Sequence, residues 1–485
     1  MIAHNSAQRY NNYAVADNPI HFGTSGWRGI IADDFTLANV RLASAGIAYH
    51  LLDKSPRPRV IVGYDTRFMS EKFADAAAEI LGTHGIETEV CQRPDPTPAI
   101  SFAVIHQRFD GAINITASHN PAEYSGLKYS SSDGAPALPD VTHAIESNVG
   151  KILSGELSLR GQMFAAPLRR PADPRPAYLE DLRRKVDLKA ISEAKMRIAY
   201  DPLYGTARGY LDDLLRESGA QLTVIHDYRD VMFSGVGPEP SEKNLAELAK
   251  IVREQGCALG VSTDGDADRF GVVDADGTWI QPNYVLALLA DYLIEVRKFP
   301  GGLGRSVATT HLIDAVAKHH HVPCYQTPVG FKYVGELIKE DKIALGGEES
   351  AGLSIRGHLP EKDGLIACLL MAEAVARRGQ SVKQQLDALF KKVGAFYPVR
   401  INLRLEPNVQ KRLLEKLKRD WDKLDTQKVV RIDRTDGLKM ILADGAWVLM
   451  RPSGTEPVVR VYCEAASPAE RDRLAAAAQA FVQNS

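Results

Sequence analysis

The sequence predicts an α/β protein of several domains that ends in a small α+β domain. Three times, a short apolar segment precedes a polar loop and residues with helical spacing: 59–65 before 70–82, 196–201 before 209–218, and 306–310 before 313–319. Such units build helices onto a sheet and place functional sites at the carboxyl ends of the strands. With 485 residues, the chain is also longer than one hydrophobic core usually supports.

The C-terminal part follows a different pattern. Residues 437–442, 446–450 and 458–463 predict closely spaced strands, and a helix is expected from 468 to about 481. The proline-rich stretch 169–176 predicts a linker between domains. These two features separate a small α+β domain and an N-terminal domain from the rest of the chain.

Composition and charge favour a cytoplasmic metabolic enzyme. The formal net charge of −2 gives no electrostatic reason to expect binding to nucleic acid or a membrane. The apolar stretch 284–294 contains Asp291 and is too short to span a membrane, and no secretory signal is recognised at the N-terminus. Five widely spaced cysteines are expected to be reduced and buried: Cys91, Cys257, Cys324, Cys368 and Cys463.

A candidate nucleophile follows the predicted strand at residues 109–115. Ser118 stands beside His119 in a loop that closes with Asn120 and Pro121. A serine hydroxyl needs a base, a metal or both before it attacks a substrate. A polar turn without chemistry is the alternative interpretation of this segment.

Three carboxylates at alternate positions follow the apolar segment 257–261. Asp264, Asp266 and Asp268 repel one another unless a cation lies between them, and Mg²⁺ takes a few carboxylates together with a phosphate oxygen. A calcium EF-hand loop is excluded, because Arg269 and Ala275 occupy the places of its glycine and its last glutamate. A solvated acidic turn remains the alternative, although Arg269 suits a phosphate or carboxylate.

Two further loops carry ligand-binding chemistry. Residues 451–457, with Arg460 nearby, combine glycine amides, hydroxyl groups and guanidinium groups, which favour an anion site over a plain Ser-Gly turn. The loop is not a Walker motif, because no Gly-Lys-Ser/Thr ending follows the gap. Residues 346–352 place acidic acceptors and a serine between glycines, and sugar hydroxyl groups require such acceptors.

With these four segments, the sequence resembles the α-D-phosphohexomutase superfamily, and most of all the phosphoglucomutases of the phosphoglucomutase/phosphomannomutase family. The resemblance runs from residues 23–29 to the loop at Arg451, and the motifs keep the family's order. It implies three similar α/β domains and a smaller C-terminal α+β domain around a central active-site cleft. The implied domains are residues 1–168, 169–283, 284–397 and 398–485.

The resemblance also implies a role for each matching residue. Ser118 would carry the phosphoryl group, with His119, Lys128 and Arg28 around it. A phosphoserine oxygen of Ser118 would join Asp264, Asp266 and Asp268 in holding one Mg²⁺. The implied substrate-binding residues are Arg269, Gly330, Phe331, Lys332, Glu348, Ser350, Lys362, Arg451, Ser453, Gly454, Thr455 and Arg460. One departure is Ser125, where the family often has asparagine, so a contact of this loop is expected to be lost.

The implied activity interconverts hexose 1-phosphate and hexose 6-phosphate through phospho-Ser118 and a hexose 1,6-bisphosphate, which also serves as activator. Residues 325–334 and 357–364 resemble the sugar loops of phosphoglucomutases and favour glucose phosphates. Mannose phosphates or dual specificity, and glucose-1,6-bisphosphate synthesis, remain open alternatives. A serine hydrolase is disfavoured because no Gly-x-Ser-x-Gly motif surrounds Ser118. A non-catalytic sugar-phosphate-binding protein would not need the serine, the metal-binding residues and the basic residues together. Small-molecule sugar phosphates are the only partners expected, and the oligomeric state is left open.

Overall fold

The chain divides into two structural units in the computed structural model, which describes residues 18–23, 25–161, 169–452 and 458–483. The first unit comprises residues 1–176 together with the separate segment Asp230–Gly237. The second comprises Ala177–Arg229 and Pro238–Ser485. Within the described ranges, no helix is both long and apolar enough to cross a membrane.

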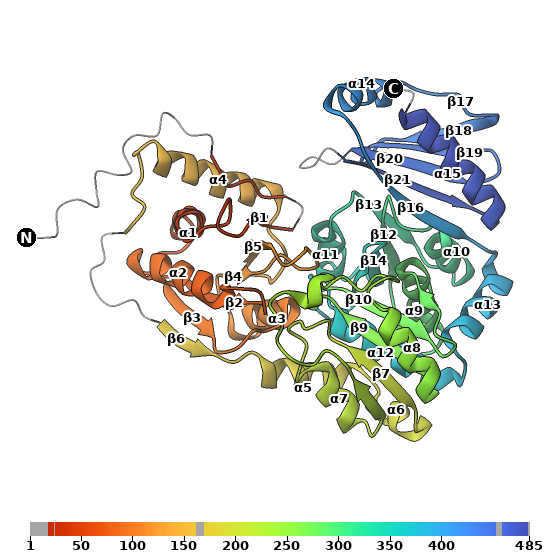
Figure 1. Ribbon diagram of the computed structural model, residues 1–485, viewed down its shortest axis with the longest axis horizontal. Coiled ribbons are helices and arrows are strands. Elements are labelled where there is room, and N and C mark those ends of the chain that lie inside the picture. Colours follow the sequence, from red (N-terminus) through yellow and green to blue (C-terminus); the bar gives the residue numbers. More distant parts are fainter. Residues whose placement is uncertain (1–17, 24, 162–168, 453–457, 484–485) are drawn as a thin grey trace, which may run out of the picture. The chain divides into compact units, whose positions relative to one another are not determined.

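The first unit is built on one mixed sheet, whose strands follow the order β1-β5-β4-β2-β3-β6 over the described residues (Figure 1). Its strands are β1 (Trp27–Ile30), β2 (Arg59–Tyr64), β3 (Glu87–Cys91), β4 (Gly111–Ile115), β5 (Tyr124–Ser131) and β6 (Arg169–Ala172). Its helices are α1 (Leu37–Leu52), α2 (Ser70–Thr83), α3 (Thr97–Gln107) and α4 (Pro139–Leu153). The β2, β3, β4 and β6 strands run parallel, whereas β5 lies antiparallel to both β1 and β4.

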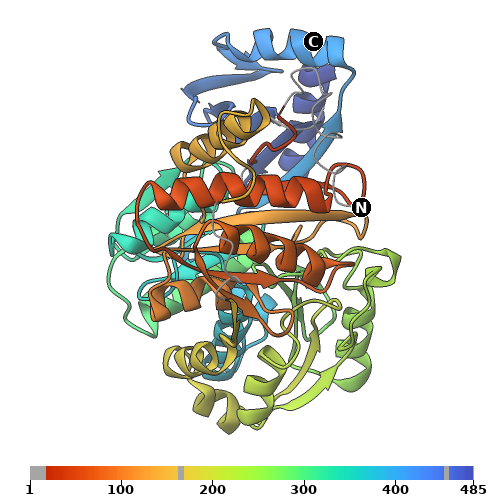
Figure 2. The same cartoon turned by 90° about the vertical axis from the view of Figure 1, so that its left-hand side faces the viewer.

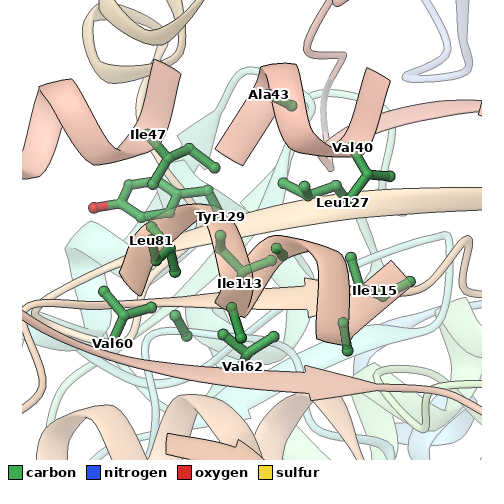
Figure 3. Close-up of a cluster of buried hydrophobic side chains, with 14 of the residues drawn as sticks. Val40, Ala43, Ile47, Val60, Val62, Leu81, Ile113, Ile115, Leu127 and Tyr129 are labelled. Atoms are coloured by element: carbon green, nitrogen blue, oxygen red, sulfur yellow. The ribbon is translucent and has the colours of Figure 1, made fainter. Parts of the chain in front are cut away.

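Helix α1 shows why this unit has a continuous core. Thr36 caps the helix by accepting a hydrogen bond from the Asn39 amide, and the helix buries Val40, Ala43 and Ile47 at helical spacing. These side chains meet the apolar residues of β2, β4 and β5, of which Tyr129 lies next to Ile47 (Figure 3). In Figure 2, α1 (red) runs alongside the sheet.

The second unit continues with two further α/β layers. The sheet β11-β10-β9-β7-β8 contains β7 (Arg197–Asp201), β8 (Gln221–Val224), β9 (Leu259–Thr263), β10 (Phe270–Asp274) and β11 (Trp279–Ile280). The sheet β13-β12-β14-β15 contains β12 (Gly302–Ser306), β13 (Cys324–Thr327), β14 (Ile343–Glu348) and β15 (Gly352–Ile355). The helices of these layers are α5 (Arg175–Lys185), α6 (Leu188–Ala194), α7 (Leu211–Glu217), α8 (Ala246–Gln255), α9 (Pro282–Glu295), α10 (Leu312–His319), α11 (Phe331–Lys339), α12 (Gly364–Arg378) and α13 (Val382–Val393).

The C-terminal part of the second unit is the predicted α+β domain, blue in Figures 1 and 2. Its antiparallel sheet follows the order β16-β21-β20-β19-β18-β17. The strands are β16 (Tyr397–Arg404), β17 (Lys423–Leu424), β18 (Gln427–Asp433), β19 (Leu438–Leu442), β20 (Trp447–Pro452) and β21 (Val458–Ala465), with helices α14 (Pro407–Leu417) and α15 (Pro468–Gln483).

A buried polar cluster joins this domain to the segment after β12. Lys439 donates hydrogen bonds to the Val307 carbonyl (2.7 Å) and to His311 Nε2 (2.9 Å), and its Nζ atom lies 3.7 Å from the centre of the Trp447 ring. Glu464 accepts hydrogen bonds from the Trp447 indole (2.7 Å) and the His311 amide (2.9 Å). Burial lowers the pKa of Lys439 to about 7 and, with Lys439 nearby, keeps the pKa of His311 well below its usual value.

One prediction from the sequence is wrong, and a second places the boundary between the two units correctly, after Pro176, but not the local structure before it. The expected strand at 306–310 ends at Ser306, because the apolar residues Val307 and Ala308 pack in a turn against Trp447, Leu449 and Tyr462 instead. The expected linker at 169–176 contains the edge strand β6, which pairs only with β3 among the described strands, and then the start of α5. A proline is compatible with an edge strand, where one side of the strand needs no hydrogen bonds.

The cysteines are free, as expected. Cys91, Cys257, Cys368 and Cys463 are buried, whereas Cys324 is partly exposed, which corrects the expectation that all five are buried.

Candidate active site

The candidate nucleophile, the three aspartates and the acidic acceptor loop lie on hairpins that occupy the same topological position in three sheets. Each hairpin joins a strand with a parallel neighbour to a strand that turns back antiparallel: β4 to β5, β9 to β10, and β14 to β15. Ser118 lies in the first hairpin loop, the three aspartates in the second, and Glu348 and Ser350 at the third. The carboxyl ends of parallel strands therefore carry the candidate chemistry, as the sequence predicts.

Ser118 is buried and has a left-handed backbone with φ of 53°. Its amide donates a hydrogen bond to Thr116 Oγ1 (2.9 Å), and its Oγ lies 3.4 Å from His119 Nδ1. A non-glycine residue in this conformation carries backbone strain, which is often found at functional sites. The structure brings Ser118 and His119 together, as the sequence predicts.

Two basic residues of the first unit project from neighbouring strands. Arg28 on β1 pairs with Gly126 on β5, two positions before Lys128, so both cationic side chains lie on one face of the sheet. Arg28 also donates a hydrogen bond to Asn120 Oδ1 (2.5 Å) in the Ser118 loop. Gly126 allows the close approach, because a Cβ atom there would lie 2.5 Å from the Thr116 carbonyl oxygen. Arg28 is thereby tied to the loop that carries Ser118.

The three aspartates form a buried carboxylate cluster. Each is 0% exposed, and one carboxylate oxygen from each lies within 4.8 Å of the others. An all-oxygen donor set of this charge suits a hard divalent cation, so the residues present fit Mg²⁺. Burying three like charges together is costly unless positive charge compensates them.

Positive charge reaches the cluster from within the second unit. Lys362 donates a hydrogen bond from Nζ to Asp268 Oδ2 (2.5 Å), and the Arg269 Nε lies 3.7 Å from Asp268 Oδ1. The Arg269 amide also donates to Asp264 Oδ1 (3.1 Å). The sequence places Lys362 among the substrate-binding residues, and the structure adds its contact with the carboxylate cluster.

Glu348, at the end of β14, lies next to the start of α11. Its Oε1 accepts a hydrogen bond from the Gly330 amide (2.7 Å). Burial, and next the neighbouring Glu349, raises the pKa of Glu348 to about 7. The structure therefore brings together Glu348 and Gly330, two of the residues predicted to bind the sugar.

The other predicted residues of this region differ in their surroundings. Lys332 is partly buried, which lowers its pKa, and Ser350 is partly buried in the turn after Glu348. Phe331 packs in a hydrophobic cluster with Val334 and Ile343. Its side chain therefore belongs to the core, and only its backbone is suited to contact a ligand.

Arg451 and Arg460 face each other across the strands β20 and β21. Like charges directly opposite in an antiparallel pair are destabilising, so the pair favours an anion that both can bind. Arg451 Nε donates to Asp436 Oδ2 (2.8 Å), and the same oxygen accepts the Val329 amide (3.2 Å). The predicted residues Ser453, Gly454 and Thr455 lie outside the described residues.

Sequence analysis missed two buried or half-buried residues of these loops. Arg67 is 0% exposed and donates hydrogen bonds to carbonyl oxygens of the Ser118 loop, and Asp436 joins Arg451 to Val329. For Arg67, the available signal was its place just beyond β2, at the same sheet edge as Ser118. For Asp436 the sequence held no signal, because its partners Arg451 and Val329 lie far from it along the chain, at the end of β20 and before α11.

Comparison with known proteins finds a matching family model in each part of the chain. Four family models match in order: phosphoglucomutase/phosphomannomutase alpha/beta/alpha domain I at residues 19–156, domain II at 176–277, domain III at 281–393, and the C-terminal domain at 401–480. Their order reproduces the three α/β domains and the C-terminal domain expected from the sequence.

Individual relatives cover almost the whole chain. A Thermococcus kodakarensis phosphoglucomutase/phosphomannomutase is 34% identical and aligns over 92% of this chain and 94% of its own length. A Delftia acidovorans phosphoglucosamine mutase is 31% identical over 96% of this chain and 98% of its own. A Thermus thermophilus crystal structure, assigned to a phosphomannomutase, has a TM-score of 0.84, 33% identity, and coverage of 96% of this chain and 99% of its own. The chain therefore belongs to the phosphoglucomutase/phosphomannomutase family and is a phosphohexomutase, an isomerase of phosphorylated hexoses.

Proposed function

We propose that this protein interconverts α-D-glucose 1-phosphate and glucose 6-phosphate through a phosphoserine at residue 118 and a glucose 1,6-bisphosphate intermediate. The observation that carries the proposal is the buried cluster of Asp264, Asp266 and Asp268, which fits a divalent cation. Phosphoryl transfer by way of a phosphorylated enzyme requires a nucleophile and positive charge near the phosphoryl group. A serine hydroxyl and a cation site would supply them in this phosphohexomutase. The proposal includes the domain boundaries and site residues predicted from the sequence.

In the first half-reaction, phospho-Ser118 transfers its phosphoryl group to the free hydroxyl group of a glucose monophosphate. The bond between Ser118 Oγ and phosphorus breaks, a bond from the sugar oxygen to phosphorus forms, and the hydroxyl proton ends on Ser118 Oγ. The second half-reaction reverses these changes with the other phosphate of the bisphosphate. His119 Nδ1, at 3.4 Å from Ser118 Oγ, is placed to hold the proton in transit.

Charge neutralisation is the main demand of this reaction, because phosphoserine carries about −1.5 to −2 charges at neutral pH. Mg²⁺, held by Asp264, Asp266 and Asp268, would supply positive charge at the phosphoryl group. Arg28 and Lys128 supply further positive charge from one face of the sheet in the first unit. Arg451 and Arg460 would bind the phosphate that is not reacting.

Glucose is the proposed sugar, with Glu348 as hydrogen-bond acceptor for its hydroxyl groups. The Gly330 amide donates a hydrogen bond to Glu348 Oε1 and so fixes the carboxyl group. The second carboxyl oxygen, Oε2, is thereby held in one orientation. Mannose phosphates are the second candidate, because the 34% identical relative bears both the phosphoglucomutase and the phosphomannomutase name. Epimers at one carbon are poorly separated when few contacts read that hydroxyl group. An Aspergillus fumigatus N-acetylphosphoglucosamine mutase with the same fold was solved with glucose 1,6-bisphosphate.

The test compares glucose, mannose and glucosamine 1-phosphates in one coupled assay with Mg²⁺ and catalytic hexose 1,6-bisphosphate. We expect kcat/KM to be highest for glucose 1-phosphate. Intact-mass measurement after incubation with the bisphosphate should find one added phosphate on Ser118. A higher kcat/KM for glucosamine 1-phosphate would overturn the sugar assignment, and turnover without Ser118 phosphorylation would overturn the mechanism.

A further inference from the structure

Arg67 binds the Ser118 loop from within the protein. Its guanidinium NH2 group donates hydrogen bonds to the carbonyl oxygens of Ser118 (2.7 Å) and Asn120 (2.6 Å). Its NH1 group donates to the carbonyl oxygens of Pro121 (2.7 Å) and Tyr124 (3.0 Å). A single side chain thus holds four carbonyl groups of the loop, which fixes the path of the backbone on both sides of His119.

The guanidinium is itself held in place by the end of β2. Asp65 Oδ2 accepts a hydrogen bond from Arg67 Nε, and Asp65 Oδ1 accepts from the Arg67 amide, both at 3.0 Å. Ser70 Oγ donates to the same Oδ1 (2.7 Å). Both charged side chains are almost fully buried, and a buried ion pair is tolerated only when further hydrogen bonds satisfy it. The carbonyl groups of the Ser118 loop supply those bonds.

An aromatic ring covers the guanidinium. Phe233 is 0% exposed, and the Arg67 Cζ atom lies 5.0 Å from the centre of its ring, a distance typical of cation–π contacts. Phe233 has a positive φ of 47°, which is rare for a bulky residue and needs compensation from packing. Burial of its ring over Arg67 supplies that compensation.

Phe233 comes from a segment that leaves its neighbours in sequence. Residues Asp230–Gly237 belong to the first unit, although the residues before and after them belong to the second. At the end of this segment, a Cβ atom on Gly237 would lie 3.9 Å from the His119 carbonyl oxygen and 3.8 Å from Pro121 Cα. The segment therefore packs directly against the Ser118 loop.

We propose that Arg67 is a positioning residue for phosphoryl transfer, and that Phe233 locks it in place. Arg67 has no role in the reaction itself. It holds the loop so that Ser118 keeps its left-handed backbone and presents Oγ in one direction. This inference rests on the proposed phosphoserine mechanism, in which the same oxygen must meet two different sugar hydroxyl groups.

The test replaces Arg67 by lysine, which keeps the charge but cannot bond four carbonyl groups in the same plane. Misplacing a reacting atom by about 1 Å can cost on the order of 100-fold in rate, so we expect kcat to fall by about that factor. The KM for glucose 1-phosphate should change less than about threefold, because Arg451 and Glu348 are untouched. The rate of Ser118 phosphorylation by glucose 1,6-bisphosphate, followed by intact mass, should fall together with kcat.

One further variant keeps the proposal testable if Arg67→Lys fails to fold, and another serves as the control. Phe233→Leu leaves the guanidinium in place and removes the ring, and we expect a smaller fall in kcat, about fivefold to tenfold, again at unchanged KM. Arg41→Met removes an arginine of the same unit that pairs with Glu79 at the surface, and it should behave as the wild type.

The outcomes separate this inference from the proposed function. A wild-type protein that gains no phosphate contradicts the phosphoserine mechanism itself. A wild type that is phosphorylated, with Arg67→Lys and Phe233→Leu matching it in kcat, overturns the positioning role. A rise in KM at wild-type kcat in either variant also overturns it, because that result belongs to substrate binding and not to loop position.

Discussion

Ser118 is buried and has a positive φ. Packing of the hydrophobic core does not by itself require this backbone conformation. Its hydroxyl lies beside His119 and its carbonyl oxygen is bound by Arg67. Contacts of the backbone thus set the orientation of Ser118, and its hydroxyl group is the part proposed to react.

We expect Ser118→Ala to abolish mutase turnover without loss of folding, because the hydroxyl oxygen is the proposed acceptor of the phosphoryl group. Circular dichroism and the melting temperature should match the wild type. Ser125→Ala is the matched control on the same hairpin, since its buried Oγ makes no hydrogen bond within the described residues. Substantial mutase activity in the Ser118 variant would be incompatible with a covalent intermediate.

Asp266→Asn should weaken Mg²⁺ binding and activity together, because it removes one of three negative charges from the cluster. Isothermal titration with Mg²⁺ and kcat at saturating metal measure the two effects separately. Asp276→Asn serves as control, because Asp276 pairs with Lys383 at the surface of the same sheet. Full wild-type activity after exhaustive chelation would exclude the metal from the mechanism.

The carboxyl group of Glu348 should limit stability at neutral and alkaline pH. Its pKa is about 7 in the folded protein against 4.5 in the unfolded chain, so folding favours the protonated form. The stabilisation is full below pH 4.5 and is lost as pH rises to 7, by about 3 kcal/mol at 1.36 kcal/mol per pKa unit. We therefore expect Glu348→Gln to melt at a higher temperature than the wild type at pH 8.

The difference in melting temperature between Glu348→Gln and the wild type should close by pH 5, while the KM of the variant for sugar phosphates stays raised. Such a trade between stability and function is common at active sites. Equal melting temperatures at pH 8 would mean that the carboxyl group is not strained by burial.

At the scale of elements, the turn between β18 and β19 joins two loops that the sequence keeps far apart. Asp436 in this turn contacts Arg451 at the end of β20 and Val329 before α11. Asp433, at the end of β18, accepts a hydrogen bond from Gln326 on β13 (2.7 Å). One short turn thereby holds both the strand that is proposed to bind phosphate and the loop that is proposed to bind the sugar.

Arg451→Ala should raise KM for both hexose 1-phosphate and hexose 6-phosphate, because one site must bind the non-reacting phosphate in either orientation. A charge-assisted contact contributes roughly 1.5–3 kcal/mol, or about tenfold to a hundredfold in binding. Asp436→Asn should raise both values by a smaller factor, since Arg451 remains but is less well oriented. Steady-state kinetics with both substrates measure these effects, and a loss for only one substrate would contradict a shared phosphate site.

Elements and residues could be predicted from the sequence where the residues that determine them lie close together along the chain. Ser118 lies beside His119, the aspartates alternate, and the three predicted strands of the C-terminal sheet, which are β19, β20 and β21, follow one another closely along the chain. Arg67 was missed because the carbonyl groups that it binds lie 51 to 57 positions further along the chain. The strand expected at 306–310 failed for the same reason, because Val307 is buried by Trp447, far along the chain, and not by a neighbouring strand.

At the scale of the whole molecule, a buried polar cluster connects distant parts of the chain and makes stability depend on pH. Lys439 is fully buried between the C-terminal sheet and the segment after β12, and His311, Glu464 and Trp447 face it or its partners. Its pKa of about 7 lies far below the 10.5 of an unfolded chain. Folding therefore favours the neutral amine.

This pKa difference makes stability rise with pH between 7 and 10.5, because over that range the unfolded chain binds a proton that the folded protein does not. In Lys439→Met this contribution is absent. The melting temperature of the variant minus that of the wild type should therefore fall as pH increases from about 7 to about 9.5, whatever its value at pH 7. Lys411→Met, on the exposed face of α14, is the control for the loss of a lysine outside the buried cluster. A flat difference for Lys439→Met would contradict the lowered pKa.

The three hairpins that carry the candidate chemistry have a consequence for engineering. Each loop leaves one strand and returns on an adjacent antiparallel strand, so its two ends are fixed by backbone pairing that does not depend on the residues at its tip. Residues 349–351 could thus be exchanged for those of a mutase with another sugar preference while the register of β14 and β15 is kept. The loop tip that carries Ser350 would then be graftable apart from the two hairpins proposed to carry the phosphoryl chemistry, while Glu348 keeps its place at the end of β14.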